Sequence, residues 1–159
     1  MKLKNSSSIQ LTIGEVESLV SNLVDLYTAI DSSSKEELIY DKFKEQRRRV
    51  HLLLKEIRRI SIPDFFPENA IGGFDGFLFL LNCRYRKRKS YKYIRGVKRS
   101  LKKAAKAFGK KKSKKACKLL ERSFRFGRRG LHYLRKLECK INTELNTAKT
   151  VQIQIQQEK

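Results

Sequence analysis

The stretch RKSYKYIRGVKRSLKKAAKAF, residues 88–108, decides how this chain folds. Apolar residues recur every three or four positions along it, which places them on one side of a helix. The basic residues fall on another side, about 150° away when each residue turns the helix by about 100°. This separation predicts a folded amphipathic helix that docks on a core, and it argues against a disordered basic tail. The apolar positions are Tyr91, Ile94, Val97, Leu101, Ala105 and Phe108, and the basic positions are Arg88, Lys92, Arg95, Arg99, Lys102 and Lys106.

The same helix belongs to a block that carries the whole net charge of the protein. Residues 84–136 hold 24 of the 38 lysines and arginines but only one acid, Glu121, so the block has a net charge of +23. The entire chain has a net charge of +22, and the rest of the sequence is therefore nearly neutral. Charge at this density destabilises a compact state by self-repulsion unless something offsets it. The sequence therefore predicts an anionic partner.

Two further amphipathic stripes precede the block. After a polar lead-in at residues 1–11, apolar positions at helical spacing run through residues 12–60, with a short polar break near Asp31. Thr12 and Ser34 are each followed three positions later by a glutamate, which is the pattern of a capping box at a helix start. Two stripes joined by a short connector predict a near-neutral antiparallel helical hairpin.

A connector at residues 61–76 holds both prolines and several glycines, so we expect it to be irregular. Its phenylalanines, Phe74 among them, are predicted to pack back onto the bundle because their exposure to water is costly. The apolar run FLFLL at residues 77–81 is interpreted as the buried start of the third helix, with Asp75 as its N-cap.

Residues 77–149 are predicted to form a second, strongly basic helical hairpin. The segment GKKKSKK at residues 109–115 has no apolar anchor and is expected to be a solvated break between its helices. Gly127 and Gly130 indicate either a kink or close packing in the fourth helix. Residues 150–159 are expected to form a flexible tail, and the alternation of apolar and polar side chains from Val151 to Gln157 fits either a fraying helix end or a short strand. The chain is thus predicted to be all-α, a single-domain bundle of about four helices in two antiparallel hairpins.

The basic block favours a non-enzymatic nucleic-acid-binding protein, with RNA ahead of DNA. Lysines and arginines on one helical face neutralise backbone phosphates and release condensed counterions. Two short clusters in the block also match addresses read by nuclear import, so nucleus and cytoplasm both stay open. The candidate phosphate contacts are Arg84, Arg86, Lys87, Arg88, Lys89, Lys92, Arg95, Arg99, Lys102, Lys106, Lys110, Lys111, Lys112, Lys114, Lys115, Arg128 and Arg129.

Aromatic residues lie between these cations. Tyr91 and Phe124 fall on the apolar stripes, and we expect them to be core residues. Tyr85, Tyr93 and Phe126 do not, and they are the candidates for stacking on unpaired bases.

Two other partner classes remain open at the level of sequence. The Gly/Phe-rich segment 70–81, followed by the polybasic helix, combines the two signals that peripheral binding to an anionic membrane requires. A helical scaffold that binds an acidic protein is the third alternative. The nearly neutral first two helices could also support a homo-oligomer.

No catalytic or metal-binding signature is found in the sequence. His51 and His132 are isolated from any nucleophile at a recognisable spacing, and no CxxC pattern is present. Cys83, Cys117 and Cys139 are expected to be reduced thiols in an intracellular protein. The sequence thus predicts no enzyme activity, no metal and no cofactor. It also predicts no secretion signal and no membrane-spanning segment.

Overall fold

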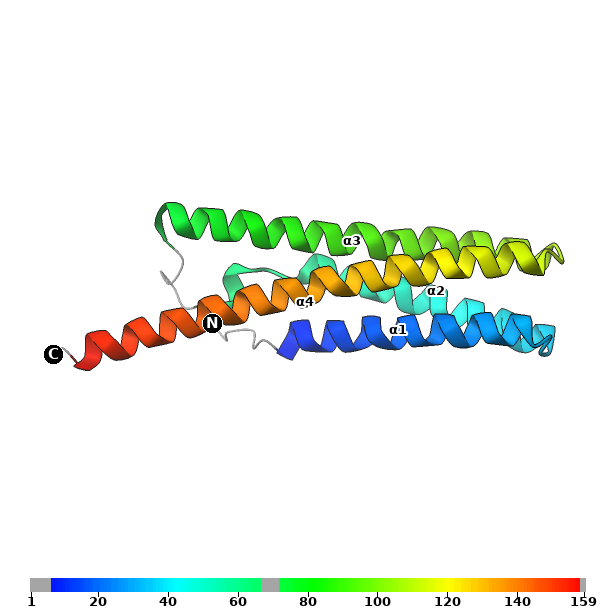
Figure 1. The fold of residues 1–159 in the computed structure, drawn as a ribbon, viewed down its shortest axis with the longest axis horizontal. Helices are drawn as coiled ribbons and strands as arrows, with labels where there is room; N and C mark the ends of the chain where they lie inside the picture. The colour runs from blue at the N-terminus through cyan, green and yellow to red at the C-terminus, as the bar shows by residue number, and fades with distance from the viewer. Residues whose placement is uncertain (1–6, 67–71, 158–159) are drawn as a thin grey trace.

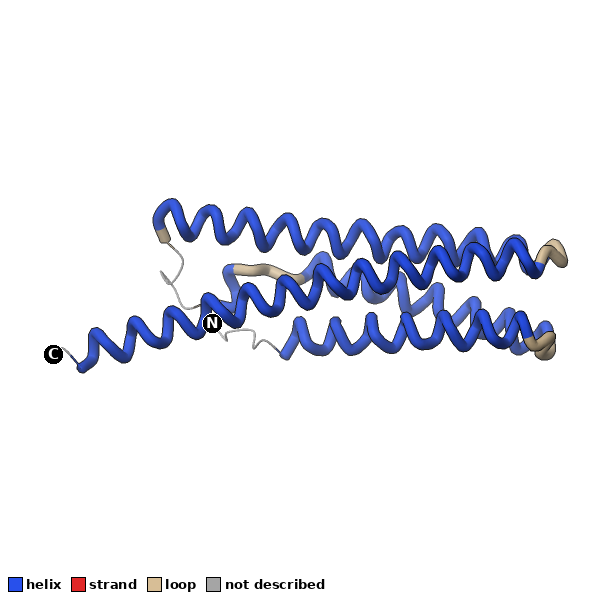
Figure 2. Tube along the Cα trace, in the orientation of Figure 1, coloured by secondary structure: helices blue, strands red, loops and turns tan. Residues whose placement is uncertain are grey.

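The computed structural model describes residues 7–66 and 72–157 and shows an elongated bundle of four α-helices (Figure 1). The helices are α1 Ser7–Asp31, α2 Glu36–Arg59, α3 Gly73–Gly109 and α4 Ser113–Gln157, and a short 3₁₀ helix, η1, covers Pro63–Phe65. Contacts join α1 to α2, α2 to α3, α3 to α4 and α4 back to α1. Both hairpin turns lie at the same end of the molecule (Figure 1), so the helices run up, down, up and down. No strand occurs in the described residues (Figure 2), and the all-α prediction is confirmed.

All four helices contribute fully buried side chains to one core. Leu19 on α1, Ile57 on α2, Leu101 on α3 and Leu134 on α4 are each completely buried. Burial of an aliphatic side chain of this size stabilises the fold by about 1.5–3 kcal/mol. Ile94, Val97 and Leu101, three of the apolar positions predicted for the third helix, are also fully buried, so its docking side lies where the periodicity placed it.

The starts of the first two helices differ from the predicted ones. α1 begins at Ser7, and Thr12 already lies inside it, where its Oγ1 donates a 3.0 Å hydrogen bond to the carbonyl oxygen of Ser8. The capping box at Thr12 is therefore wrong, since the hydroxyl bonds back to the preceding turn. The N-cap of α2 is Lys35, without a side-chain capping bond, so the capping box at Ser34 is wrong as well.

The connector between α2 and α3 is shorter than predicted. α3 begins at Gly73, where φ is +67°, a left-handed conformation that glycine adopts without strain. Its N-cap is Gly72, and Asp75 lies in the first turn, so the prediction of Asp75 as N-cap is wrong. Residues 67–71 of the predicted connector lie outside the described residues.

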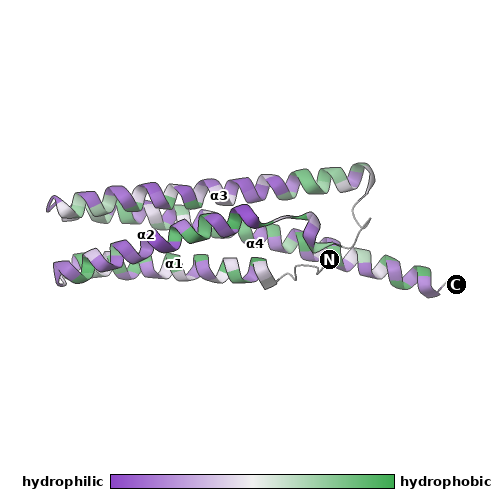
Figure 3. Cartoon of the chain, turned by 180° about the vertical axis from the view of Figure 1, so that it is seen from behind, coloured by the Kyte–Doolittle hydropathy of each residue, from purple (hydrophilic) through white to green (hydrophobic). Residues whose placement is uncertain are grey.

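The start of α3 is also less buried than expected. Phe65 and Phe66 pack into the core, as the sequence predicted for the connector phenylalanines, but Phe74 is 74% exposed. In the run at 77–81 only Phe79 is buried, whereas Phe77, Leu78 and Leu81 are exposed. The interpretation of this run as a buried helix start is therefore wrong for three of its five residues. Figure 3 shows these first turns of α3 coloured as hydrophobic.

The fourth helix is longer than predicted at both ends. Only residues 110–112 form the turn between α3 and α4, because α4 starts at Ser113 within the expected break. At the other end α4 continues to Gln157 and extends beyond the other helices (Figure 1). Of the alternatives for this end of the chain, the helix is confirmed for residues 150–157, whose alternating side chains are all exposed.

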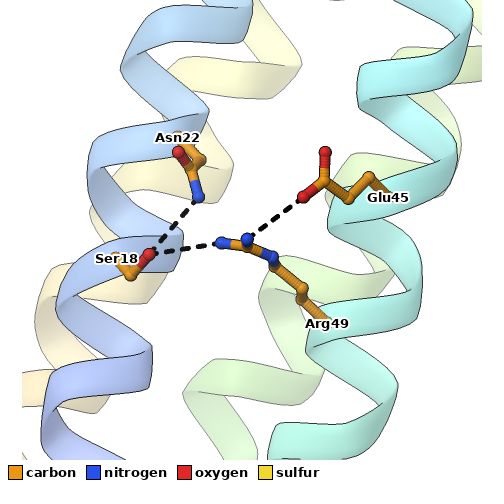
Figure 4. A network of polar contacts seen from close by, with 4 residues as sticks. All are labelled: Ser18, Asn22, Glu45 and Arg49. Carbon is orange, nitrogen blue, oxygen red and sulfur yellow. Dashed lines mark hydrogen bonds and ion pairs between the residues drawn. The ribbon is translucent and has the colours of Figure 1, made fainter.

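A polar network joins the first two helices on their exposed side (Figure 4). Arg49 of α2 donates a 3.2 Å hydrogen bond to the Oγ of Ser18 on α1 and forms an ion pair of 3.1 Å with Glu45. Asn22 also donates to the Ser18 hydroxyl, at 3.5 Å. Exposed contacts of this kind contribute little to stability, typically about 0.2–1 kcal/mol each, but they fix Arg49 between the two helices.

Candidate nucleic-acid interface

Small residues line the contact between α3 and α4, which we call the seam. A Cβ atom added at Gly130 would lie 2.7 Å from the Cδ1 of Ile94, and one added at Gly96 would lie 3.0 Å from the ring of Phe126. Ser90 on α3 is fully buried against this contact. Because α4 runs unbroken through its glycines, Gly130 serves close packing and not a kink. The seam therefore holds the two most basic helices of the chain side by side.

Exposed cations cover the outward sides of both helices along the seam. Most of the residues predicted as phosphate contacts belong to this set, which we call the cationic face. Its predicted members are Arg84, Arg88, Lys92, Arg95, Arg99, Lys102 and Lys106 on α3, Lys110 and Lys112 in the turn, and Lys114, Lys115, Arg128 and Arg129 on α4. Sequence reasoning did not select seven further exposed cations of residues 84–136, Lys98 and Lys103 on α3 and Lys118, Arg122, Arg125, Arg135 and Lys136 on α4.

Three predicted contacts are engaged within the chain itself. The Nζ of Lys87 donates to the carbonyl oxygens of Arg58 at 2.9 Å and Ile60 at 2.6 Å, and its burial lowers the pKa of its ammonium group. Arg86 donates a 2.7 Å hydrogen bond to the carbonyl oxygen of Lys136. A third cation, Lys111, forms an ion pair with Glu36 of α2. The structure thus separates these three from the freely exposed cations.

Four aromatic rings gather along one side of the seam. Tyr93 of α3 and Tyr133 of α4 stack with ring centroids 5.7 Å apart and planes 14° from parallel. Tyr85 meets Tyr133 edge-on at 6.4 Å, and Phe126 lies 6.3 Å from Tyr93. The three predicted stacking residues are therefore brought together, and Tyr133, which sequence reasoning missed, joins them. We call these four residues the aromatic strip.

Cations flank the rings of the aromatic strip. The Nζ of Lys89 lies 5.3 Å from the centroid of Tyr85, and the guanidinium of Arg122 lies 5.4 Å from that of Phe126. The guanidinium of Arg129 lies 5.8 Å from the centroid of Tyr93. Each pair is within the range of cation–π attraction, about 0.5–1 kcal/mol at an exposed site. Positive charge and flat π surfaces are thus interleaved on one side of the molecule.

The two aromatic residues assigned to the core behave differently from each other. Tyr91 packs against the core, with the guanidinium of Arg58 5.0 Å from its ring centroid. Phe124 is half-buried and lines an open cavity of about 350 Å³ between α1 and α4. Glu121, the lone acid of the basic block, lines the same cavity and raises the pKa of the neighbouring Tyr27 hydroxyl. Phe124 is therefore a wall of this cavity and not a core residue.

The remaining chemistry-bearing residues form no centre. Within residues 7–66 and 72–157, no group of histidines, cysteines and acids is placed to hold a metal ion. Cys83 is fully buried, and burial raises its pKa to about 11, while Cys139 is exposed. His132 lies against the ring of Tyr133, at 5.6 Å between centroids.

None of the described helices contains an apolar stretch long enough to cross a lipid bilayer. Comparison of this chain with models of protein families, with curated proteins and with solved structures finds no match.

Proposed function

We propose that this protein is a non-enzymatic nucleic-acid-binding protein that contacts phosphates through the cationic face, with RNA favoured over DNA. The observation that carries the proposal is the seam, because it fixes beside each other the two helices that carry residues 84–136, a block with 24 cations and one acid. At a rise of 1.5 Å per residue, the 37 residues of α3 extend for about 55 Å, enough to follow many phosphates along a nucleic acid. RNA is favoured because unpaired RNA presents bases to aromatic side chains.

The energy of this contact is electrostatic. Each phosphate that a lysine or arginine neutralises releases condensed counterions, so affinity falls steeply as salt is added. If about eight phosphates are engaged, the logarithm of the affinity should fall with the logarithm of the salt concentration at a slope near −7 on duplex DNA. The same release offsets the self-repulsion that the cationic face imposes on the folded protein.

A mobility shift at several salt concentrations tests the proposal. RNA, single-stranded DNA and duplex DNA of equal length are titrated with the full chain. We expect binding to at least one of them with a slope that reports several phosphate contacts. The proposal fails if none of the three is bound at about 50 mM salt, where counterion release is still strongly favourable.

A separate observation favours a second function, peripheral binding to anionic membranes. Phe74, Phe77, Leu78 and Leu81 are exposed on the first turns of α3, directly before Arg84. Interfacial binding requires apolar side chains that enter the lipid together with cations that attract anionic headgroups. This end of α3 presents both. The acidic-protein and homo-oligomer alternatives gain no comparable observation and stay predictions.

Vesicle flotation separates the second function from the first. Vesicles with anionic lipid should carry the protein upward, whereas neutral vesicles should not. Phe77→Asp should abolish flotation, because it places a charge where the side chain would enter the lipid. Lys103→Gln changes the charge by the same single unit farther along α3 and serves as the matched control. Equal flotation of the two variants would count against insertion of this segment.

A further inference from the structure

We infer that the ligand of the cationic face is an unpaired nucleic-acid strand and that the aromatic strip receives its bases. This inference rests on the proposed function and names its substrate class. Tyr85, Tyr93, Phe126 and Tyr133 come from two antiparallel helices, and only the seam brings them into one row.

The length of the aromatic strip suits a short run of nucleotides. On α3 it extends from Tyr85 to Gly96, whose missing side chain leaves room for the ring of Phe126. These eleven steps along the helix correspond to about 16 Å. A strand with a rise of 3.4 Å per nucleotide covers that distance with about five nucleotides. The strip therefore matches the site sizes of proteins that bind single strands through stacking platforms.

The exposure of Tyr85 favours a role in binding over a role in packing. Tyr85 is 53% exposed, and its ring has a T-shaped contact with Tyr133 and the ammonium of Lys89 5.3 Å from its centroid. A residue that served packing alone would gain by burying this ring. An exposed aromatic face beside a cation is instead the pairing that holds a base and its phosphate together.

The arginines of the strip complete the same pattern. Arg122 and Arg129 lie over Phe126 and Tyr93 with their guanidinium groups near the ring faces. A planar guanidinium stacks on a base as well as on a side chain, and it can also neutralise a neighbouring phosphate. The bases of a duplex are already stacked on each other and cannot reach these rings. The strip should therefore add affinity only for unpaired strands.

Fluorescence anisotropy with matched probes tests this inference. The probes are single strands of RNA and of DNA about 12 nucleotides long, which exceeds the strip, and the corresponding duplexes. The variants are Tyr85→Leu and Tyr133→Leu, which remove a ring but no charge, with Tyr85→Phe and Tyr133→Phe as controls that keep the ring. Each leucine variant should weaken binding to single strands about tenfold. Binding to duplexes should not change, and the phenylalanine variants should bind as the unaltered protein does.

Tyrosine emission provides a second readout that does not depend on a substitution in a half-buried ring. The chain has six tyrosines and no tryptophan, and three of the six lie in the strip. Single strands should quench the emission on binding and duplexes should not, and Tyr85→Phe should reduce the quenching.

The outcomes separate the inference from the function on which it rests. If no probe binds, the proposed function fails. If single strands and duplexes bind but the leucine variants lose no affinity for single strands, the inference fails and phosphate binding stands. Equal quenching by duplexes would overturn the inference in the same way. Tighter binding to one of the two single strands identifies whether the ligand is RNA or DNA.

Discussion

The Nζ of Lys87 lies 2.6 Å from the carbonyl oxygen of Ile60, the residue that caps the end of α2. A second bond of 2.9 Å reaches the carbonyl oxygen of Arg58. The last carbonyl groups of a helix have no partner within the helix, and a lysine close to them satisfies them and complements the negative end of the helix dipole. One member of the basic block thus joins α3 to α2 instead of facing solvent.

Lys87→Met should therefore destabilise the protein without weakening its phosphate contacts. The substitution keeps the aliphatic stem but removes the donor, and we expect the free energy of unfolding in urea to fall by about 1–2 kcal/mol. Lys92→Met, at an exposed position of the cationic face, should change stability by less than about 0.5 kcal/mol. The salt slope of nucleic-acid binding should respond in the opposite way, with a loss of about 0.7–0.9 for Lys92→Met only. Indistinguishable variants would show that Lys87 acts as one more surface charge.

The salt dependence of nucleic-acid binding should depend on which helix carries a cation, and not only on the net charge of the protein. A triple variant Arg95→Gln, Arg99→Gln and Lys102→Gln removes three exposed cations from α3, and the variant Lys44→Gln, Arg47→Gln and Arg48→Gln removes three from α2. If each α3 residue contacts a phosphate, the first variant should reduce the salt slope by about two to three. The second should leave the slope nearly unchanged and lower affinity only through the weaker overall field. A mobility shift in a salt series measures both, and equal slopes would contradict a localised face.

Two glycines should respond in opposite directions to alanine. A Cβ at Gly127 would lie 2.9 Å from the Cγ2 of Val20, a β-branched side chain with little freedom to move, whereas Gly14 has nothing within 4 Å. Overpacking costs about 1–3 kcal/mol and outweighs the gain in helix propensity at Gly127. Gly14→Ala should stabilise the protein by about 0.5–1 kcal/mol. Urea unfolding of both variants checks the close packing of α4 against α1, and stabilisation by Gly127→Ala would show that these two helices can move apart at little cost.

The three thiols should differ in reactivity and in their effect on alkaline stability. Iodoacetamide should modify Cys139, which is exposed, well before the buried Cys83, and mass spectrometry of the folded protein follows the order.

Burial raises the pKa of Cys83 from 9.0 to about 11, so the folded state keeps a proton that the unfolded state loses above pH 9. The stability that this thiol contributes is therefore fully present below pH 9 and is lost as the pH rises through about 11. Cys83→Ala should cost less stability in strong alkali than at neutral pH. A cost that does not change with pH would contradict this assignment.

The parts of the fold that follow from helical periodicity could be predicted from the sequence. Ile94, Val97 and Leu101 are buried because a stripe at 3.6-residue spacing has only one way to face a core. The exposure of Phe77 could not be predicted, because it depends on how far the neighbouring helices extend along α3. The first turn of α1 was missed because the capping-box pattern placed the helix start at Thr12, although Ile9 continues the apolar stripe four positions before Ile13 and is buried.

Only part of the candidate site could be predicted from the sequence, for a related reason. Exposed cations such as Arg95 follow from the helical face on which they lie, but Lys87 carries no signal that distinguishes it from its neighbours in RYRKRK. Tyr133 was missed because its partner, Tyr93, lies on another helix. Which residues meet across the seam depends on the relative position of two antiparallel helices, and single-sequence periodicity does not contain that information.

Because of the seam, the melting temperature of this protein should depend on the polyanions and the salt in solution. Folding brings the positive charges of α3 and α4 close together, and unfolding lets them spread apart, so a polyanion should bind the folded state more tightly than the unfolded one. The melting temperature of the protein should rise when phosphate-rich polymers are added. It should fall as the buffer is diluted, because the Debye length then grows and the like charges repel each other more strongly. The melting temperature therefore reports whether a polyanion is bound to α3 and α4, and this measurement does not require the natural ligand to be known.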